Sequence, residues 1–420
     1  MLSGALSPND YQKLINELQS WMINQIWQLE EQQFHIGEFS IAGDQLRLFL
    51  YDPTEVARNY QLEGPNAVRG AEREALIAES RRMNAELVFS GIKAAISLKN
   101  SWLPEKSNLQ RVRNQLDMHG LGIAMHIGQA HLCNRADGRR RIEGFTINFG
   151  KRIAGLTRFG KYSRIMVSQE AHDKIRSAIC KHTMLRQRIF FHEHDADIEV
   201  LKAIAQPIRI YELKFFSRIG ITLPKDVIEI YEKLFRTDGS NLWAYYQLFE
   251  HYAYHVHDWD KVYNLAKSAL LVHPNDEKVL LDMSRCYMHR GSMDQAYRFA
   301  ELALKANPEF DLAYEHLAVM AHKRGDIEAR RAYLSKALSL TPGSPICHLN
   351  LGYALCDSHE LDEATFHMLE AFSSYPDYLS DATTRSNLSL LRADGLLPQK
   401  VQTYLDEYDA VHATTEKQQG

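Results

Sequence analysis

Two polar side chains four residues apart, Asn148 and Arg152, form the clearest chemical pair in this 420-residue sequence. An α-helix through the segment FTINFGKRIAGLTRF would carry both on one face, because residues i and i+4 are neighbours on a helix surface. Asp44 stands beside Gly43, between two strand-like runs, and its carboxylate is a hard oxygen donor of the kind that divalent cations bind. Considered alone, the three residues also fit a helix asparagine, a solvated arginine and a turn aspartate.

Other patterns with a chemical interpretation are better explained by structure. HEHDAD, residues 192–197, offers histidine and carboxylate ligands, but its short spacing and the lack of a second cluster favour a solvated loop. RADGRRR, residues 135–141, lacks interleaved aromatic residues and favours a charged hairpin loop. GLGIAMHIG lacks the third glycine of a dinucleotide fingerprint. The five cysteines are scattered and never spaced C-x-x-C, which indicates reduced core thiols: Cys133, Cys180, Cys286, Cys347 and Cys356.

A repeat with a period of 34 residues organises the C-terminal half. Alanines recur where two helices must approach closely, and prolines recur where the second helix must end: Ala269, Ala303, Ala337 and Ala371, then Pro274, Pro308, Pro342 and Pro376. The pattern resembles tetratricopeptide (TPR) repeats and predicts an all-α TPR solenoid, with repeats over 241–376 and capping helices after them. Its concave face is expected to bind a protein or peptide. The aromatic residues at helical spacing between 243 and 259 are expected in the core rather than in that groove.

The N-terminal half alternates helical and strand-like segments and is predicted to form a separate domain. Helices are expected over 8–32 and 70–100, and FSIAG and QLRLFLY predict a hairpin around Gly43 and Asp44. GIAMHIGQAHLCN predicts paired strands, and the closing strand is PIRIYELK. This order predicts an α+β fold in which helices cover one face of an antiparallel sheet. The predicted boundaries are 1–214 for this domain, 215–225 for a linker, 226–411 for the helical domain and 412–420 for a flexible tail.

The charge and hydrophobicity of the sequence argue against two classes of protein, those that bind nucleic acids and those that bind membranes. The 49 basic and 53 acidic side chains leave a formal charge of −4, too small a bias to indicate a nucleic-acid or membrane-surface protein. No run of about 18 consecutive apolar residues occurs, and the N-terminus lacks a basic-then-apolar signal pattern. We therefore expect a cytoplasmic protein without nucleic-acid or membrane partners.

Five segments of the N-terminal half, taken in order, resemble the catalytic domain of class III nucleotide cyclases, which has a ferredoxin-like α+β fold. IAGDQLRLFL resembles the family's K-x-I-G-D-G hairpin, and MHIGQAHLCN resembles its H-x-G strand. INFGKRIAGL resembles the V-N-x-A-x-R-L helix, and GLTRFGKYSRIMVS resembles the passage into the next strand. LKAIAQPIRIYEL resembles the closing L-K-G-I-x-x-P-V-x-V-Y-E-L segment. The resemblance spans residues 2–214, with differences in loop length.

The resemblance implies a specific chemistry. In this family the 3'-hydroxyl of a nucleoside triphosphate attacks its own α-phosphate, so the protein must position the ribose, hold two divalent ions and offset growing negative charge. By resemblance Asn148 orients the ribose, Arg152 stabilises the transition state, Asp44 binds Mg or Mn, and Lys202 binds the triphosphate. A homodimer is implied as well, because in this family each active site is shared between two domains.

Other positions depart from the family pattern. Ser40 and Arg139 occupy the base-reading positions, where they match neither adenylate nor guanylate cyclases. The second metal aspartate of the family lies on a strand before the first helix, and the opening MLSGALSP resembles the segment that immediately follows that strand. Either the strand is absent or it lies upstream of the given start.

Two functions therefore stay open for the chain. In the first, it is a cyclic-nucleotide signalling enzyme, an adenylate or guanylate cyclase-like lyase whose TPR module receives a regulatory signal. In the second, a catalytically inactive cyclase-homology domain dimerises or senses a nucleotide within a TPR scaffold. The retained Asn148, Arg152 and Asp44 favour the first, and the departures at Ser40 and Arg139 favour weak or absent catalysis.

Overall fold

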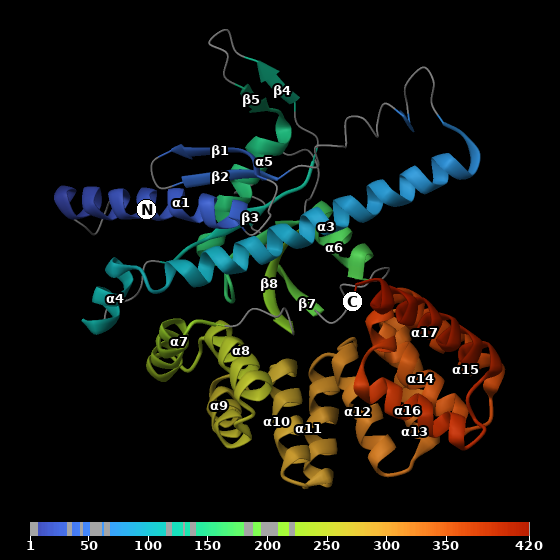
Figure 1. The fold of residues 1–420 in the computed structure, drawn as a ribbon. Helices are drawn as coiled ribbons and strands as arrows, with labels where there is room; N and C mark the ends of the chain where they lie inside the picture. Colours follow the sequence, from blue (N-terminus) through green and yellow to red (C-terminus); the bar gives the residue numbers. More distant parts are fainter. Residues whose placement is uncertain are drawn as a thin grey trace. The chain divides into compact units, whose positions relative to one another are not determined.

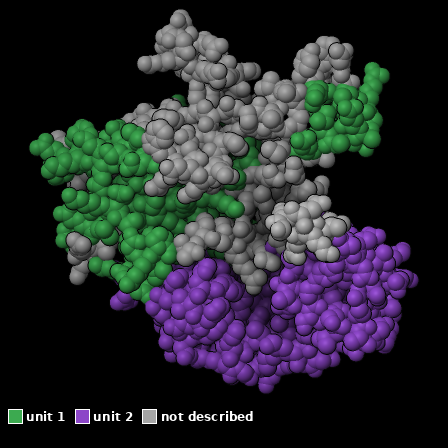
Figure 2. Space-filling view, in the orientation of Figure 1, with its two compact units in different colours: residues 1–178, 189–234 green, residues 179–188, 235–420 purple. Residues whose placement is uncertain are grey.

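The computed structural model describes residues 7–31, 36–42, 45–50, 61–62, 68–114, 120–128, 131–134, 140–179, 188–194, 209–217 and 223–419 (Figure 1). The chain divides into two compact units, residues 1–178 with 189–234 and residues 179–188 with 235–420 (Figure 2). Helix α7, Lys225–Thr237, falls mostly within the first unit, whereas the predicted helical domain begins at residue 226.

The first unit mixes helices with short strands. Its helices are α1 (Pro8–Glu31), α3 (Gly70–Trp102), α4 (Lys106–Arg113), α5 (Phe145–Leu156), α6 (Gln169–Ile179) and α7, with a 3₁₀ turn η1 (Thr157–Phe159) after α5. Its strands are β1 (Ile36–Ala42), β2 (Gln45–Leu50), β3 (Ile123–Met125), β4 (His131–Asn134), β5 (Arg140–Glu143), β6 (Ile165–Ser168), β7 (Arg188–His194) and β8 (Ile210–Ser217). The predicted α+β class therefore holds, and helices occupy the ranges expected around 8–32, 70–100 and FTINFGKRIAGLTRF, whereas the sequence pattern did not predict α4.

The central sheet has the strand order β3-β6-β8-β7 and is mixed rather than antiparallel. Strands β6 and β8 are antiparallel, but β3 and β6 are parallel, with Ile123 opposite Ile165. Parallel neighbours require a long crossover connection, and the stretch through β4, β5 and α5 supplies it. The prediction of an antiparallel sheet is therefore wrong at this pair.

The structure confirms one of the two predicted strand pairings and contradicts the other. Strands β1 and β2 pair with Ala42 opposite Gln45, so two residues connect them, as the Gly43-Asp44 pattern predicts. Strands β3 and β4, predicted to pair with each other, lie in separate sheets, because β4 pairs with β5 instead. Residues 43 and 44 themselves lie outside the described part of the chain.

Helices cover both faces of the sheet at β3, whereas the sequence predicts one covered face. Ile123 packs against the cluster formed by α1 and α3, in which the Trp21 and Trp102 rings meet edge to face at 5.1 Å. The next residue, Ala124, packs against a second cluster that includes residues of α5. Because side chains alternate across a strand, the two clusters lie on opposite faces. All four residues of β6 are buried accordingly.

The second unit consists of paired antiparallel helices. The pairs are α8 (Leu242–Glu250, continued by the π-helical turn η3, His251–Val256) with α9 (Trp259–Val272), α10 (Glu277–His289) with α11 (Met293–Ala306), α12 (Asp311–Lys323) with α13 (Ile327–Leu340), and α14 (Pro345–Asp357) with α15 (Leu361–Ser374). A 3₁₀ turn η4 (Pro376–Leu379), α16 (Ala382–Ala393) and α17 (Gln399–Gln419) follow. Helix α17 runs through residues for which the sequence predicts a flexible tail.

The pattern of small residues has the structural role that the sequence predicts. Ala269, Ala303, Ala337 and Ala371 are all completely buried in the second helices of the four pairs. At Gly352 of α14, a Cβ atom would lie 2.6 Å from Cγ of Met368 on α15, which shows how closely the two helices approach. The aromatic cluster near the start of the unit belongs to the core, as expected, since its main members are buried: Trp243, Tyr245, Tyr246, Phe249 and Tyr252.

The first helix of the first pair contains one extra residue, which the π-helical turn η3 absorbs. In each pair we compare the N-cap of the first helix with the left-handed residue of the turn. Sixteen positions separate Asn241 from His257 in the first pair, whereas 15 positions separate Asp276 from Gly291 in the second. The spacing is also 15 in the third and fourth pairs. A π turn widens the helix locally and accommodates a one-residue insertion. The 34-residue period is therefore restored at the turn between α8–η3 and α9.

The turn between the two helices of each pair requires a left-handed backbone. The residue concerned recurs every 34 positions and has φ values of +61° at His257, +74° at Gly291, +72° at Gly325 and +61° at His359. Glycine adopts this conformation without a steric cost, whereas a side chain with a Cβ atom is strained there. Two of the four turns therefore carry strain.

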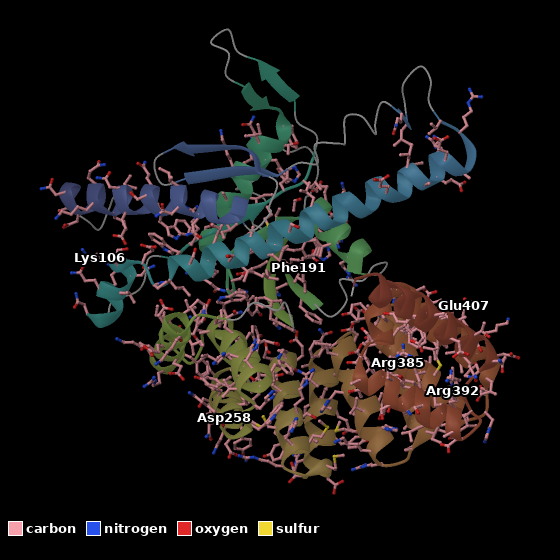
Figure 3. The ribbon with its side chains drawn as sticks, viewed as in Figure 1. Lys106, Phe191, Asp258, Arg385, Arg392 and Glu407 are labelled. Atoms are coloured by element: carbon pink, nitrogen blue, oxygen red, sulfur yellow. The ribbon has the colours of Figure 1, made fainter. Side chains whose placement is uncertain are left out.

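Helices α16 and α17 pack through a shared apolar core, with Leu388 and Leu391 of α16 in the same cluster as Val401 of α17, and ion pairs lie at its edge. Arg385 binds the carboxylate of Asp409 with both Nη atoms, and Arg392 donates to Asp406 at 2.9 Å (Figure 3 labels the two arginines). These two helices extend the core of the last helical pair. No helix within the described ranges is long and apolar enough to cross a membrane.

We predict that His359→Gly stabilises the second unit by about 0.5–1 kcal/mol. Relief of the left-handed strain gives about 1–2 kcal/mol, and the greater backbone freedom of glycine in the unfolded chain removes about 0.5–1 kcal/mol. His257→Gly should gain less, because it also loses the hydrogen bond from Nδ1 of His257 to the Ala253 carbonyl, 3.1 Å long. Urea unfolding, monitored by the circular dichroism signal of the helices, measures the change in stability of both variants. A lower urea midpoint for His359→Gly than for the wild type would contradict the strain argument.

Candidate functional site

Helix α5 carries the two residues that the sequence singles out. It begins after Gly144, whose φ of +142° lies in a region that favours glycine. Phe149, Ile153 and Leu156 form its buried stripe and pack with Met166 of β6 and Ile210 of β8. Their spacing of three and four residues turns one face of the helix to the sheet and leaves the opposite face free for function.

Asn148 and Arg152 lie off this buried stripe, one helical turn apart. Asn148 is exposed and Arg152 is half-buried, and neither side chain forms a hydrogen bond or ion pair with another described residue. The helix therefore presents an amide and a guanidinium together, as the sequence predicts. Of the other predicted site residues, Ser40 lies on β1 opposite Arg47, and the structure describes its backbone but not its side chain. Three predicted site residues lie outside the described residues: Asp44, Arg139 and Lys202.

The orientation of α5 is fixed through Phe149. The His126 ring meets the Phe149 ring edge to face at 4.6 Å, and the exposed Phe145 ring stacks against Phe149 at 5.7 Å. His126 is itself held by Ser168, with 2.9 Å between Nδ1 and Oγ. Burial lowers the pKa of His126, and nearby Glu170 only partly opposes this. A neutral His126 thus acts as a packing and hydrogen-bonding support for the helix.

The loop that follows α5 and η1 is fixed by a buried carboxylate. Glu212 of β8 is fully buried and accepts three backbone hydrogen bonds of 2.8 Å each, from the amides of Lys161, Tyr162 and Arg164. At Gly160 a Cβ atom would lie 2.6 Å from Oε1 of Glu212, so only glycine fits there. Three charge-assisted hydrogen bonds satisfy the carboxylate and anchor the C-terminal end of α5 to the sheet.

The described residues do not form a two-ion site. Cyclase chemistry requires two carboxylates close enough to clamp two divalent ions. No group of three or more His, Cys, Asp or Glu side chains within the described ranges is arranged to hold a metal, and Asp44 lies outside those ranges. The polar groups that α5 offers include the Asn148 amide and the Arg152 guanidinium.

In the second unit, charged side chains are buried between the first helices of neighbouring pairs. Lys278 and Asp282 of α10 form an ion pair of 2.6 Å with side chains no more than 1% exposed. The Tyr245 hydroxyl of α8 donates to Asp282 at 3.1 Å, and Arg285 donates to the same carboxylate at 3.3 Å. The Lys278 ammonium also lies 3.9 Å from the centroid of the Phe249 ring. We call these five residues the α8–α10 network.

Burial governs the pKa values in this network. It lowers the pKa of Lys278 and raises the pKa of Asp282, and in each case the partner's charge opposes the shift. It also raises the pKa of Tyr245 well above its usual value, so the hydroxyl stays protonated and acts as a donor. A buried network in which each polar group has a partner is suited to holding helices in place.

A second buried polar contact joins α10 to α12. The Ser284 hydroxyl donates to the Ala296 carbonyl, so its oxygen accepts from Nε2 of His316 at 3.0 Å. Burial, reinforced by the positive charge of Arg285, lowers the pKa of His316 to about 3. His316 is therefore neutral throughout the physiological range.

The viewed surface of the second unit is hollowed between its two ends (Figure 2).

Sequence reasoning did not identify these buried polar residues. Glu212 stands within the apolar strand run IYELKFF, where a carboxylate is unusual, and that contrast was an available signal. Lys278 and Asp282 stand four apart in a helix, a spacing normally interpreted as a surface ion pair. Only the packing of α8 on α10 makes the pair a buried one. The HEHDAD histidines His192 and His194 lie on β7 rather than in the predicted loop.

Comparisons with known proteins agree with the repeat assignment. The sequence profile of the tetratricopeptide repeat family matches residues 253–319. No curated protein sequence matches the chain. The second unit therefore contains TPR repeats, as the 34-residue period predicts.

Several solved structures of low similarity were also found. A thermophilic TPR protein of Thermus thermophilus is 18% identical, with 39% of this chain and 89% of that chain covered and a TM-score of 0.34. MamA of Desulfovibrio magneticus RS-1 is 17% identical, with 36% and 84% covered and a TM-score of 0.31. The Cut9–Hcn1 hetero-tetramer of the APC/C is 17% identical, with 46% and 35% covered and a TM-score of 0.35.

We predict that Asp282→Asn destabilises the second unit by about 3–5 kcal/mol, because it removes the carboxylate charge that pairs with the buried Lys278 ammonium. Lys278→Met should cost less, since Arg285 and the Tyr245 hydroxyl still satisfy Asp282. Chemical unfolding of the two variants beside the wild type measures the difference. If both variants lost the same amount of unfolding free energy, the prediction that Asp282→Asn is the more damaging change would be wrong.

We also predict an acid-labile second unit. The folded-state pKa of His316 is about 3, whereas an unfolded histidine titrates near 6.5, so the unfolded chain binds more protons between these values. His316 therefore makes stability fall as the pH falls from about 6.5 toward 3, with a slope on the order of 1 kcal/mol per pH unit. Unfolding free energies measured between pH 4 and 7 should show a flatter slope in His316→Asn. The control His359→Asn, at an exposed histidine, should keep the wild-type slope.

Proposed function

We propose that the chain is a two-part signalling protein, in which the TPR unit binds a protein partner and the N-terminal unit is a nucleotide-cyclase-homology module. In this proposal the N-terminal unit binds a nucleoside triphosphate and has weak or no cyclase activity. The paired presentation of Asn148 and Arg152 on α5 is the observation that carries the nucleotide part. The repeat stack carries the protein-binding part.

The TPR unit is suited to protein binding by its construction. Stacked helical pairs bury their core between neighbours and leave an extended surface, which repeat proteins use to bind peptides and proteins. The α8–α10 network and the His316 contact fix the first helices of three successive pairs, so the surface formed by these helices is pre-organised. A pre-organised surface loses less entropy when a partner binds.

The α5 face supports nucleotide binding by the chemistry of its groups. The Asn148 amide can donate and accept hydrogen bonds and so can orient a ribose hydroxyl. The Arg152 guanidinium can form two parallel hydrogen bonds to phosphate oxygens and offset their charge. The packing of Phe149 and the Glu212 anchor hold the helix that carries both groups, as a binding site requires.

The proposal of weak or absent turnover rests on the base-reading positions. Ser40 and Arg139 match neither class of cyclase, and an arginine at the second position places positive charge where a neutral base edge would lie.

Nucleotide binding to the full chain tests the proposal. Fluorescent ATP and GTP analogues should bind, and Arg152→Ala should weaken binding about 10- to 100-fold, because charge-assisted hydrogen bonds contribute about 1.5–3 kcal/mol. Asn148→Ala should weaken nucleotide binding less, because the hydrogen bonds that it removes come from an uncharged amide. Cyclic AMP and cyclic GMP, measured in Mg and in Mn, should be near background.

The matched control is Arg176→Ala, which removes an exposed arginine from α6 instead. It should leave nucleotide binding unchanged. Absence of binding in the wild type, or equal affinities in the wild type and Arg152→Ala, would refute the nucleotide part of the proposal. Robust cyclic-nucleotide formation that Arg152→Ala abolishes would instead identify an active cyclase.

A further inference from the structure

Two histidines of the last TPR pair meet in a way that neither the repeat architecture nor the proposed function requires. His348 lies on α14 and His367 on α15, and their Nδ1 atoms are 2.8 Å apart. The ring centroids are 5.0 Å apart and the ring planes are inclined by 36°, so the two nitrogens lie between the rings. The side chain of His367 is 13% exposed, and His348 is 8% exposed.

The outer nitrogen of each ring faces an oxygen atom. Nε2 of His348 lies 2.9 Å from the Pro342 carbonyl oxygen, which can only accept, so this nitrogen carries the proton of His348. Nδ1 of His348 is then an acceptor, and Nδ1 of His367 must donate to it. Nε2 of His367 is left with a lone pair and lies 3.8 Å from the Glu363 carboxylate.

This arrangement matches the outer contacts of metal-binding histidines. A histidine that ligates a metal through one nitrogen usually donates the proton on its other nitrogen to a carbonyl or a carboxylate. His348 already makes such a contact with a carbonyl, and His367 has a carboxylate placed to accept one. Neutral imidazole is the form that ligates a metal ion.

We propose that Nδ1 of His348 and Nδ1 of His367 bind a divalent transition-metal ion, such as Zn²⁺. On binding, the proton of His367 moves from Nδ1 to Nε2, and the exposed Glu363 carboxylate, 3.8 Å from Nε2 in the free protein, moves closer to accept a hydrogen bond from it. Both Nδ1 lone pairs then become free for the metal. No proton is released, because each ring keeps one. The two nitrogens separate to about 3.3 Å, the distance that tetrahedral zinc with bonds of about 2.0–2.1 Å requires.

The protein supplies two ligands of this site. No group of three or more ligand-type side chains occurs in the part of the chain that the structure describes, so water or a partner's donor completes the coordination. A two-histidine site binds less tightly than a structural zinc site with four protein ligands. Copper and nickel should bind too, with copper tighter than zinc, in the usual order for nitrogen ligands.

Isothermal titration of the untagged full chain with Zn²⁺ at a pH of about 7.5, where neutral histidine is the ligating form, tests the proposal. We expect one principal site per chain, weakened at least 10-fold in both His348→Gln and His367→Gln. The control His359→Gln removes an exposed histidine of the same helical pair and should keep the wild-type affinity. Glu363→Gln should weaken binding by up to about 10-fold, the smaller end of outer-contact effects.

Two further readouts keep the test independent of folding defects. Titration in buffers of different ionisation enthalpy should show near-zero proton release, and electron paramagnetic resonance with Cu²⁺ should show two coordinated imidazole nitrogens. Circular dichroism checks that each variant is folded. Absence of Zn²⁺ binding, or binding that both histidine variants retain, would overturn the proposal, as would a copper spectrum without imidazole nitrogens.

Discussion

Close approach of the two helices in each pair is the constraint on which the second unit depends. A fully buried alanine recurs every 34 residues at this contact, and Gly352 leaves less room than a single methyl group would need. With the helices this close, the turn between them must reverse the chain within a few residues, which imposes a left-handed residue at the same position of every pair. The proline that follows each pair then ends the second helix.

The same constraint explains how the stack accommodates irregularity. The first pair has one residue more than the others, and the π-helical turn at His251–Val256 absorbs it before the turn is reached. Two pairs use histidine instead of glycine at the left-handed position and accept the strain. The packing of helix on helix is therefore more stringent than the local preferences of the residues in the turns.

Buried polar groups specify the geometry in both units. Glu212 anchors the loop after α5 through three backbone amides, and Asp282 collects a lysine, an arginine and a tyrosine between α8 and α10. Such groups are costly to bury unless every partner is in place, so they disfavour alternative packings more than they add stability. In the N-terminal unit this rigidity holds the helix that presents Asn148 and Arg152. In the TPR unit it fixes the helices that form the surface for a partner.

The sequence by itself determined the features that repeat or are local. The 34-residue period established the helical pairs and their close contacts, the Gly43-Asp44 pattern established the β1–β2 hairpin, and the four-residue spacing placed Asn148 and Arg152 on one helix face. Tertiary structure decided the rest. Whether β3 pairs with β4 or runs parallel to β6 depends on where the crossover through α5 packs, and no local pattern encodes that. Likewise, Lys278 and Asp282 have the spacing of a surface pair, and only the neighbouring helix α8 turns them into a buried one, because burial is a property of the packed assembly rather than of any segment.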